Sequence, residues 1–198
     1  MPEMKIFDLF SVEGVVVEDP GLKHVIDLTP KLLLKSHGRD RKEFAKVRVN
    51  IIERLMRIVQ VPGSRGKKHR IITGWMTGKY QKSAKIVIEA FKIVEKKTGK
   101  NPIAVFIKAI ENAAPREEIT NIEYGGARYP QPVDTSPVRR VNLALRFFVH
   151  GAYDKAFKKK ATIVESLAKE IMLAAENSAD SYAVQKRRDL EKQADAAR

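Results

Sequence analysis

Three segments of the chain begin with the same short signal, in which a residue that can cap a helix is followed by proline. The signal occurs at Thr29-Pro30, Asn101-Pro102 and Ser136-Pro137. A side-chain oxygen at the N-cap accepts a hydrogen bond from the first turn, and proline suits the first helical position because the N–H it lacks would be unpaired there. The repeated signal predicts a mainly α chain, with helices beginning at these three places.

Apolar residues recur at spacings of three and four, as they do on the buried stripe of an amphipathic helix. A helix is predicted over about 41–58. Its buried stripe comprises Phe44, Val47, Ile51, Ile52, Leu55 and Ile58. Its remaining surface comprises Arg41, Lys42, Lys46, Arg48, Arg54 and Arg57. Further helices are predicted over about 81–97, 102–114, 137–152, from 162 onward and over 181–197, which gives a single domain of about six helices.

Residues 119–135 have a different character, since two short β-prone runs surround the pair Gly125-Gly126. This pattern predicts a β-hairpin. Pro130 and Pro132 cannot donate to a ladder, and a two-stranded ribbon has little core of its own, so we expect a projecting arm. Exposed Tyr124, Arg128 and Tyr129 would then offer stacking faces and charge to unpaired bases. The alternative is a hairpin that lies flat on the helices with its tyrosines half buried.

The N-terminal region shows weaker patterns. Residues 4–18 alternate imperfectly between apolar and polar, with Gly14 as an interruption, and predict a short extended or hairpin segment that packs on the main body. Pro20-Gly21 then predicts a turn.

Positive charge is concentrated in one part of the chain. The whole sequence carries 38 Lys and Arg against 24 Asp and Glu, a net charge of +14, and residues 35–82 hold 14 basic and 3 acidic side chains. Such a stretch repels itself unless an anion neutralises it, so a polyanion is the expected partner. The alternative is a basic face that serves only solubility. Residues 61–70, a basic loop, are expected to become ordered on RNA.

Several catalytic and cofactor sites are not supported by the sequence. The chain lacks cysteine, H-E-x-x-H, G-x-S-x-G and G-x-G-x-x-G, and its four histidines lack ligand spacing, so we expect no catalytic residue, metal or cofactor. The run Gly74-x-x-x-Gly78-Lys79 is one residue shorter than the phosphate-binding loop G-x-x-x-x-G-K-S/T. Gly63-Ser-Arg-Gly66 matches the G-x-x-G clamp of KH domains but lacks their strands. No membrane helix or signal peptide is expected.

Longer motifs carry a resemblance to a known family. They comprise Asn101-Pro-Ile, Ala104-Val105, Ala109-Ile-Glu-Asn-Ala-Ala-Pro-Arg-Glu-Glu118, Tyr124-Gly-Gly126, Tyr129-Pro-Gln, Val133-Asp-Thr-Ser-Pro137, Arg139-Arg-Val-Asn-Leu-Ala-Leu-Arg146, Val49-Asn-Ile-Ile-Glu-Arg-Leu55 and Ser181-Tyr-Ala-Val-Gln-Lys-Arg187. Together they resemble small-subunit ribosomal protein seven over about residues 4–198. The longer N-terminal region and residues 59–78 are more like the archaeal and eukaryotic branch, and the basic surface favours the archaeal side.

The resemblance implies a fold, a function and partners. We expect residues 1–28 to be an extension packed on a helical domain, 29–198, with its hairpin at about 119–135. The expected function is that of a cytoplasmic structural protein of the small ribosomal subunit, which binds rRNA, nucleates assembly of the head and lies near the exit-site tRNA and mRNA path. Small-subunit proteins nine and eleven are expected neighbours.

Candidate RNA-binding residues follow from charge and from the resemblance. Those expected to hold rRNA phosphates are His37, Arg39, Arg41, Lys42, Lys46, Arg65, Lys67, Lys68, Arg70, Lys79, Lys82, Arg139, Arg140, Lys158, Lys159 and Lys160. On the C-terminal helix they are Lys186, Arg187 and Arg188. The tRNA- and mRNA-facing residues of the hairpin are Tyr124, Gly125, Gly126, Arg128 and Tyr129. The rival functions are a DNA-architectural protein, which a helical body with a β-ribbon also suits, and a nucleotide-dependent RNA-modifying enzyme.

Overall fold

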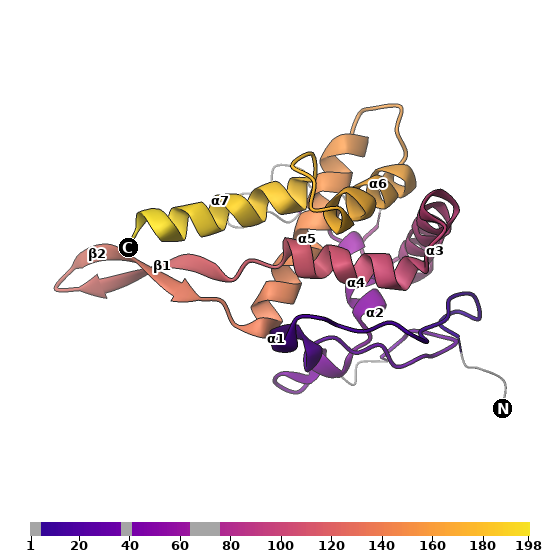
Figure 1. Cartoon of the computed structure of the whole chain (residues 1–198), viewed down its shortest axis with the longest axis horizontal. Coiled ribbons are helices and arrows are strands. Elements are labelled where there is room, and N and C mark those ends of the chain that lie inside the picture. Colours follow the sequence, from indigo (N-terminus) through magenta and orange to yellow (C-terminus); the bar gives the residue numbers. More distant parts are fainter. Residues whose placement is uncertain (1–4, 37–40, 64–75) are drawn as a thin grey trace.

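The computed structural model describes residues 5–36, 41–63 and 76–198. Within these residues the elements are α1 (Pro20–Lys23), the 3-10 helix η1 (Ala45–Arg48), α2 (Ile51–Val59), α3 (Tyr80–Thr98), α4 (Pro102–Ala113), β1 (Glu117–Tyr124), β2 (Ala127–Asp134), α5 (Pro137–Ala156), α6 (Ile163–Ala175) and α7 (Tyr182–Ala196). The predicted mainly α fold with one antiparallel hairpin is confirmed (Figure 1).

Capping residues begin most of the long helices where the sequence predicts them. Asn101 accepts a hydrogen bond from the Ile103 N–H at 3.0 Å, with Pro102 in the first turn of α4. Thr162 and Glu165 form the predicted capping box of α6. Pro137 begins α5, although the Ser136 side chain makes no capping bond there. These contacts satisfy N–H groups that a helix cannot pair internally.

The prediction of a helix at Thr29-Pro30 is wrong, since no helix begins there among the described residues. The groups that would start it are engaged elsewhere. Asp27 accepts from the Thr29 N–H at 2.9 Å, and the Asn50 side chain donates to the Thr29 carbonyl at 3.0 Å. The Ile51 N–H also donates to the Asp27 carbonyl at 3.0 Å. This segment therefore joins the N-terminal region to the start of α2.

The helix predicted over 41–58 begins ten residues later, at Ile51. Phe44 has a left-handed backbone (φ 56°), which interrupts helical geometry, and Asn50 caps α2 by accepting from the Ile52 N–H at 2.9 Å. As a result Phe44, predicted to be buried, is 80 % exposed. The later stripe residues Ile51, Ile52 and Leu55 are buried as predicted.

Arg54, predicted on the surface, is buried at 5 % exposure. Its guanidinium donates to the Val25 carbonyl and to the Asn142 side chain, both at 3.0 Å. Burial lowers the pKa of Arg54 to about 10, because the low-polarity interior disfavours the charged form. The side chain thus joins α2 to the N-terminal region and to α5, and it is not available to a ligand.

A chain of aromatic rings crosses the core. Phe10, Phe91, Phe106 and Phe148 follow one another with ring centroids 5.8, 5.4 and 6.3 Å apart, in tilted or edge-on arrangements that aromatic pairs prefer. These residues come from the N-terminal region, α3, α4 and α5. One continuous core therefore includes the N-terminal region, whose described part, residues 5–28, contains α1 and an isolated bridge but no strand.

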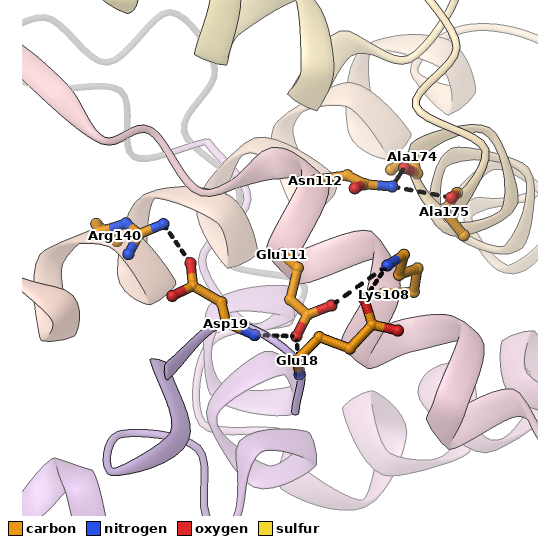
Figure 2. Close-up of polar contacts among 8 residues, drawn as sticks. All are labelled: Glu18, Asp19, Lys108, Glu111, Asn112, Arg140, Ala174 and Ala175. Atoms are coloured by element: carbon orange, nitrogen blue, oxygen red, sulfur yellow. Dashed lines mark hydrogen bonds and ion pairs between the residues drawn. The ribbon is translucent and has the colours of Figure 1, made fainter. Parts of the chain in front are cut away.

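Polar side chains of α4 hold its two neighbours (Figure 2). Glu111 accepts from the backbone N–H groups of Glu18 and Asp19 at 2.6 and 3.0 Å, and Lys108 donates to Glu18 at 2.5 Å. On the other side Asn112 donates to the carbonyls at the end of α6, Ala174 and Ala175, both at 2.9 Å. Helix α4 is therefore fixed between the N-terminal region and α6.

The hairpin extends from the helical body, with α7 beside its base (Figure 1). Glu191 accepts from the Arg116 N–H at 3.1 Å, and Arg198 donates to Glu117 at 2.5 and 2.6 Å. Beyond this base both strands are exposed. The projecting arm is confirmed, and the flat alternative is wrong.

The strand register explains how the hairpin accommodates its two prolines. Tyr124 pairs with Ala127 across the two-residue turn, Asn121 pairs with Pro130, and Ile119 pairs with Pro132. Hydrogen-bonded and non-hydrogen-bonded pairs alternate along an antiparallel ladder, and the pair next to a two-residue turn is hydrogen-bonded. Both prolines therefore occupy non-hydrogen-bonded positions, where no N–H is needed within the hairpin.

A buried carboxylate joins the last three helices. Glu170 of α6 is fully buried and accepts from the Lys155 ammonium of α5 at 2.7 Å. It also accepts from the Ser181 hydroxyl at 2.7 Å and from the Ala183 N–H at 3.0 Å, at the start of α7. Negative charge at a helix N-terminus is favoured by the free N–H groups and the helix dipole. Gly151 lies close by, where an added Cβ would come within 2.7 Å of Tyr182.

The Glu170→Ala substitution is expected to destabilise the fold by about 2–5 kcal/mol, because it leaves the buried Ser181 hydroxyl and Ala183 N–H without their acceptor and removes the ion-pair partner of Lys155. Urea unfolding followed by circular dichroism measures this change. Glu165→Ala is the matched control on the same helix and should cost about 1 kcal/mol, since it removes only an exposed capping contact. Equal destabilisation in the two variants would contradict the role assigned to Glu170.

Candidate nucleic-acid interface

Six of the predicted RNA-binding residues lie outside the described residues: His37, Arg39, Arg65, Lys67, Lys68 and Arg70. The other cations of the basic stretch are divided by the fold. Arg54 and Arg57 turn toward the body, where Arg57 pairs with Glu53 at 2.7 Å. Those with exposed side chains are Lys35, Arg41, Lys42, Lys46, Arg48, Lys79 and Lys82. The outward charge of the stretch is thus smaller than its sequence suggests.

One group of exposed cations surrounds Phe44. A hollow of about 450 Å³ on one side of this residue is lined by four cations, Lys31, Lys35, Lys42 and Arg48. Glu43 is the one carboxylate among its lining residues. A second hollow, of about 260 Å³, is lined by Phe44 together with Arg139, Arg146 and the first turns of α5. This arrangement brings together cations that are more than 90 residues apart in the sequence.

A second group lies at the connection between α5 and α6. Lys158, Lys159 and Lys160 are all exposed there, as predicted. Lys158 and Lys82 line the same groove of about 540 Å³, so α3 contributes to this surface as well. The Lys158 ammonium lies 5.6 Å from the centroid of the Phe157 ring, within reach of a cation–π contact. The three lysines can therefore approach a phosphate backbone from one loop.

The predicted group on α7 is partly used by the fold. Arg187 donates to the Asn112 carbonyl at 2.8 Å and lies 3.5 Å from Glu191, with 21 % of its side chain exposed. Lys186 pairs with Asp189 at 3.0 Å. Arg188 is exposed, with one guanidinium nitrogen 3.5 Å from the Asn177 carbonyl. Arg187 therefore holds α7 against α4, while Lys186 and Arg188 lie nearer to solvent.

Adjacent arginines at the start of α5 have different environments. Arg139 is exposed and donates twice to Glu118 of the hairpin base, and these hydrogen bonds raise the pKa of Arg139. Arg140 is 9 % exposed and donates to Asp19 at 2.7 Å (Figure 2). The assignment of Arg140 to an RNA contact therefore needs correction, because its charge is already paired inside the fold.

The partner of Arg140 responds to this contact. Burial by itself would raise the pKa of Asp19, but hydrogen bonds from Arg140 and from the Gly21 N–H, together with nearby positive charge, hold that pKa below its ordinary value of 3.8. The carboxylate is thus favoured over the acid in the folded chain. The pair joins the N-terminal region to α5 across 121 positions of sequence.

The tip of the hairpin exposes aromatic and apolar side chains. Tyr124 is 81 %, Tyr129 54 % and Ile122 51 % exposed. Alternate residues of a strand share a face, and Ile122 pairs directly with Tyr129, so all three lie on one face of the ribbon. Arg128 lies on the opposite face beside Glu123, at 3.5 Å. The predicted Tyr124 and Tyr129 are therefore brought together, whereas Arg128 is separated from them.

The turn itself requires glycine. Gly125 and Gly126 have φ of 59° and 82°, which residues with a side chain rarely adopt. Two such residues in sequence form the turn that matches the twist of the flanking strands. The prediction of a Gly-Gly hairpin turn is confirmed.

Charge and periodicity did not identify several residues of this interface. Lys31, Lys35, Arg48 and Arg146 belong to the hollows beside Phe44 but were absent from the candidate residues. Phe44 itself was assigned to the core because its spacing fits the stripe of α2. Ile122 was missed because only the register shows that it shares a face with the tyrosines.

Among the described residues no cluster of three or more His, Asp or Glu could hold a metal, and no helix could cross a membrane.

Arg140→Ala is expected to destabilise the folded chain by about 1–3 kcal/mol, since Asp19 is left without its buried donor. Thermal and urea unfolding measure this change. Arg139→Ala, at the neighbouring arginine whose side chain is 56 % exposed, is the matched control and should cost less than Arg140→Ala, because water already screens this pair. Because the pKa of Asp19 is lowered, the contribution of the pair is full above pH 3.8 and disappears as the pH falls further. Wild-type stability at pH 7 in Arg140→Ala would refute the assignment.

Comparison with known proteins shows which family the chain belongs to. The family model described as "Ribosomal protein S7p/S5e" matches residues 29–198. The chain is 50 % identical over 197 residues to "Small ribosomal subunit protein uS7" of Nanoarchaeum equitans, covering 99 % of this chain and 100 % of the relative. It is 43 % identical over 194 residues to the protein of the same name from Methanothermobacter thermautotrophicus, covering 97 % and 98 %. The chain therefore belongs to the S7p/S5e family of ribosomal proteins, as a structural constituent of the small ribosomal subunit and not an enzyme.

Proposed function

We propose that the chain binds small-subunit rRNA directly, nucleates assembly of the head and places its hairpin at the exit-site tRNA and mRNA path. The observation that carries this proposal is a separation of charge. The exposed cations lie on the helical body, whereas the hairpin strands hold four carboxylates and one cation, a net charge of −3. The body therefore suits phosphate, and the hairpin does not.

The body supplies two surfaces for rRNA phosphates. One is formed by the hollows beside Phe44 with Arg41, Lys42 and Lys46 close by in sequence, and the other by Lys82 with Lys158–Lys160. Lys79, and Lys186 and Arg188 of α7, add to this charge. The candidates His37, Arg39, Arg65, Lys67, Lys68 and Arg70 are proposed from the sequence alone. Each Lys or Arg that neutralises a phosphate releases counterions, which gives affinity with steep salt dependence.

The hairpin suits a different kind of contact. Two of its carboxylates are occupied at its base, Glu117 by Arg198 and Glu118 by Arg139. Its tip presents Tyr124 and Tyr129 beside two glycines, and aromatic faces stack on unpaired bases without reading sequence. The glycines allow close approach of a nucleic-acid backbone. This supports a position next to tRNA or mRNA and not within the main rRNA footprint.

Neighbouring proteins and domain boundaries complete the proposal. We place small-subunit proteins nine and eleven among its neighbours, and residues 1–28 as an extension on a 29–198 domain. Support for that extension comes from Ile6 and Phe10, which lie in the common core.

Replacing Lys158, Lys159 and Lys160 by Ala is expected to weaken binding to a head-domain rRNA transcript. The slope of log K against log salt should fall by about one for each phosphate that the variant no longer neutralises. Filter binding at several salt concentrations measures both quantities. Lys92, Lys96 and Lys97 of α3, replaced together, provide the matched control with the same change of charge. Equal effects of the two triple variants, or duplex DNA competing as well as rRNA, would contradict a specific rRNA surface.

Shortening the hairpin should separate assembly from exit-site events. Removing the two cross-strand pairs Glu123–Arg128 and Ile122–Tyr129 keeps the turn and the alternation of faces. We expect unchanged rRNA affinity and head assembly, measured by reconstitution, but altered retention of deacylated tRNA at the exit site. The Asn121→Ala variant, which changes the opposite face of the ribbon and none of the candidate residues, is the control. Failure of head assembly in the shortened chain would contradict the division of roles.

A further inference from the structure

Phe44 is the most exposed phenylalanine of the chain, and rRNA binding through cations alone does not account for it. All eight phenylalanines are described, and four of them form the aromatic chain of the core. Phe157, the other strongly exposed one, is 39 % exposed, against 80 % for Phe44. A single exposed apolar side chain is common on protein surfaces, so a ligand is inferred here only together with the backbone of Phe44 and the cations around it.

The backbone at Phe44 strengthens this view. Its φ of 56° lies in the left-handed region, where a Cβ is crowded and where glycine or asparagine is the usual choice. Phe44 stands at the N-cap of η1, and a phenyl ring cannot accept a hydrogen bond from the free N–H groups there. Strained residues of this kind concentrate at ligand contacts.

Cations line two hollows that share Phe44. Phe44 lines both hollows, the first with Lys31, Lys35, Lys42 and Arg48 and the second with Arg139 and Arg146. Within the described part of the chain, Lys42, Arg48 and Arg146 form no ion pair with a carboxylate. Ser136, whose hydroxyl makes no capping bond, also lines the second hollow. An exposed ring with cations in two adjoining hollows matches one nucleotide, whose base can stack while the phosphates 5′ and 3′ of its ribose are bound.

We propose that Phe44 is a stacking platform for one unpaired rRNA base, whose 5′ and 3′ phosphates lie in the two hollows. The inference deepens the rRNA binding proposed above and rests on it. A base within a duplex is covered on both faces, so the ligand is a bulge, a loop or a strand end. The alternative ligand of Phe44 is an apolar surface of a neighbouring protein. Such a surface would lie against the cations of both hollows without neutralising them.

Substitutions at Phe44 test the platform on a protein-free head-domain rRNA transcript. Phe44→Ala and Phe44→Leu should each weaken binding by about 5- to 150-fold, the range expected for one base–aromatic stack. Phe44→Trp should stay within about threefold, because indole stacks at least as well. The slope of log K against log salt should not change, since the ring neutralises no phosphate. Val16→Ala, at another exposed apolar residue, is the control.

Phe44→Gly distinguishes the ligand contact from a role in folding. Glycine adopts a positive φ freely, so the variant should have a Tm equal to or higher than that of the wild type and yet show the same reduction in rRNA affinity. Ultraviolet cross-linking followed by mass spectrometry should place a nucleotide on the peptide that contains Phe44.

Each contrary result has its own meaning. If Phe44→Leu binds the transcript like the wild type, or Phe44→Ala binds within twofold of the wild type, base stacking on Phe44 is overturned. The proposed rRNA binding still stands in that case if the Lys158–Lys160 variant binds rRNA more weakly. A Phe44→Ala chain that binds the transcript normally but enters reconstituted heads poorly would indicate a protein partner. It would overturn the proposal that Phe44 stacks on an rRNA base. Wild-type protein that prefers rRNA no more than duplex DNA would overturn the proposed function itself.

Discussion

The carboxylate of Glu170 is the contact on which the arrangement of the C-terminal half depends. It accepts from Lys155 of α5 and, at the start of α7, from the Ser181 hydroxyl and the Ala183 N–H. A buried charge is tolerated only when its hydrogen-bonding capacity is satisfied, and here that requires three helices to meet at one point. Gly151 allows the close approach, since a side chain there would collide with Tyr182. The direction of α7 follows from this junction, and α7 in turn fixes the base of the hairpin through Glu191 and Arg198.

Cations in this chain serve two purposes that the sequence does not distinguish. Arg54, Arg140 and Arg187 connect distant segments, and each donates to a carbonyl, an amide oxygen or a carboxylate of the fold. The exposed lysines beside Phe44 and in the loop after α5 make no such contact within the described residues, whereas Arg139, also beside Phe44, donates to Glu118 at the hairpin base. Arginine suits the first purpose because its planar fork makes several directed hydrogen bonds at once. The surplus charge that remains outward is the charge that we propose binds rRNA.

Local signals predicted much of the fold. The helix starts at Asn101 and Thr162 and the Gly-Gly turn depend on neighbours within a few residues, and all appear where expected. Signals that depend on distant partners failed. Thr29 is held by Asn50, Arg140 pairs with Asp19, and Arg54 reaches Asn142, so none of their environments follows from periodicity. The cations of the candidate site were partly predicted by charge, whereas Phe44 was missed because three- and four-residue spacing cannot reveal a left-handed residue.

The two prolines of β2 have an effect beyond the hairpin itself. At a non-hydrogen-bonded position the backbone N–H and carbonyl point away from the partner strand, toward whatever lies outside. Pro130 and Pro132 occupy two such positions in succession, so the outer rim of β2 lacks two donors that an incoming strand would need. A long exposed ribbon is otherwise a template for self-association during the interval between synthesis and incorporation into a subunit. These prolines allow the chain to carry such a ribbon without recruiting a second copy of itself.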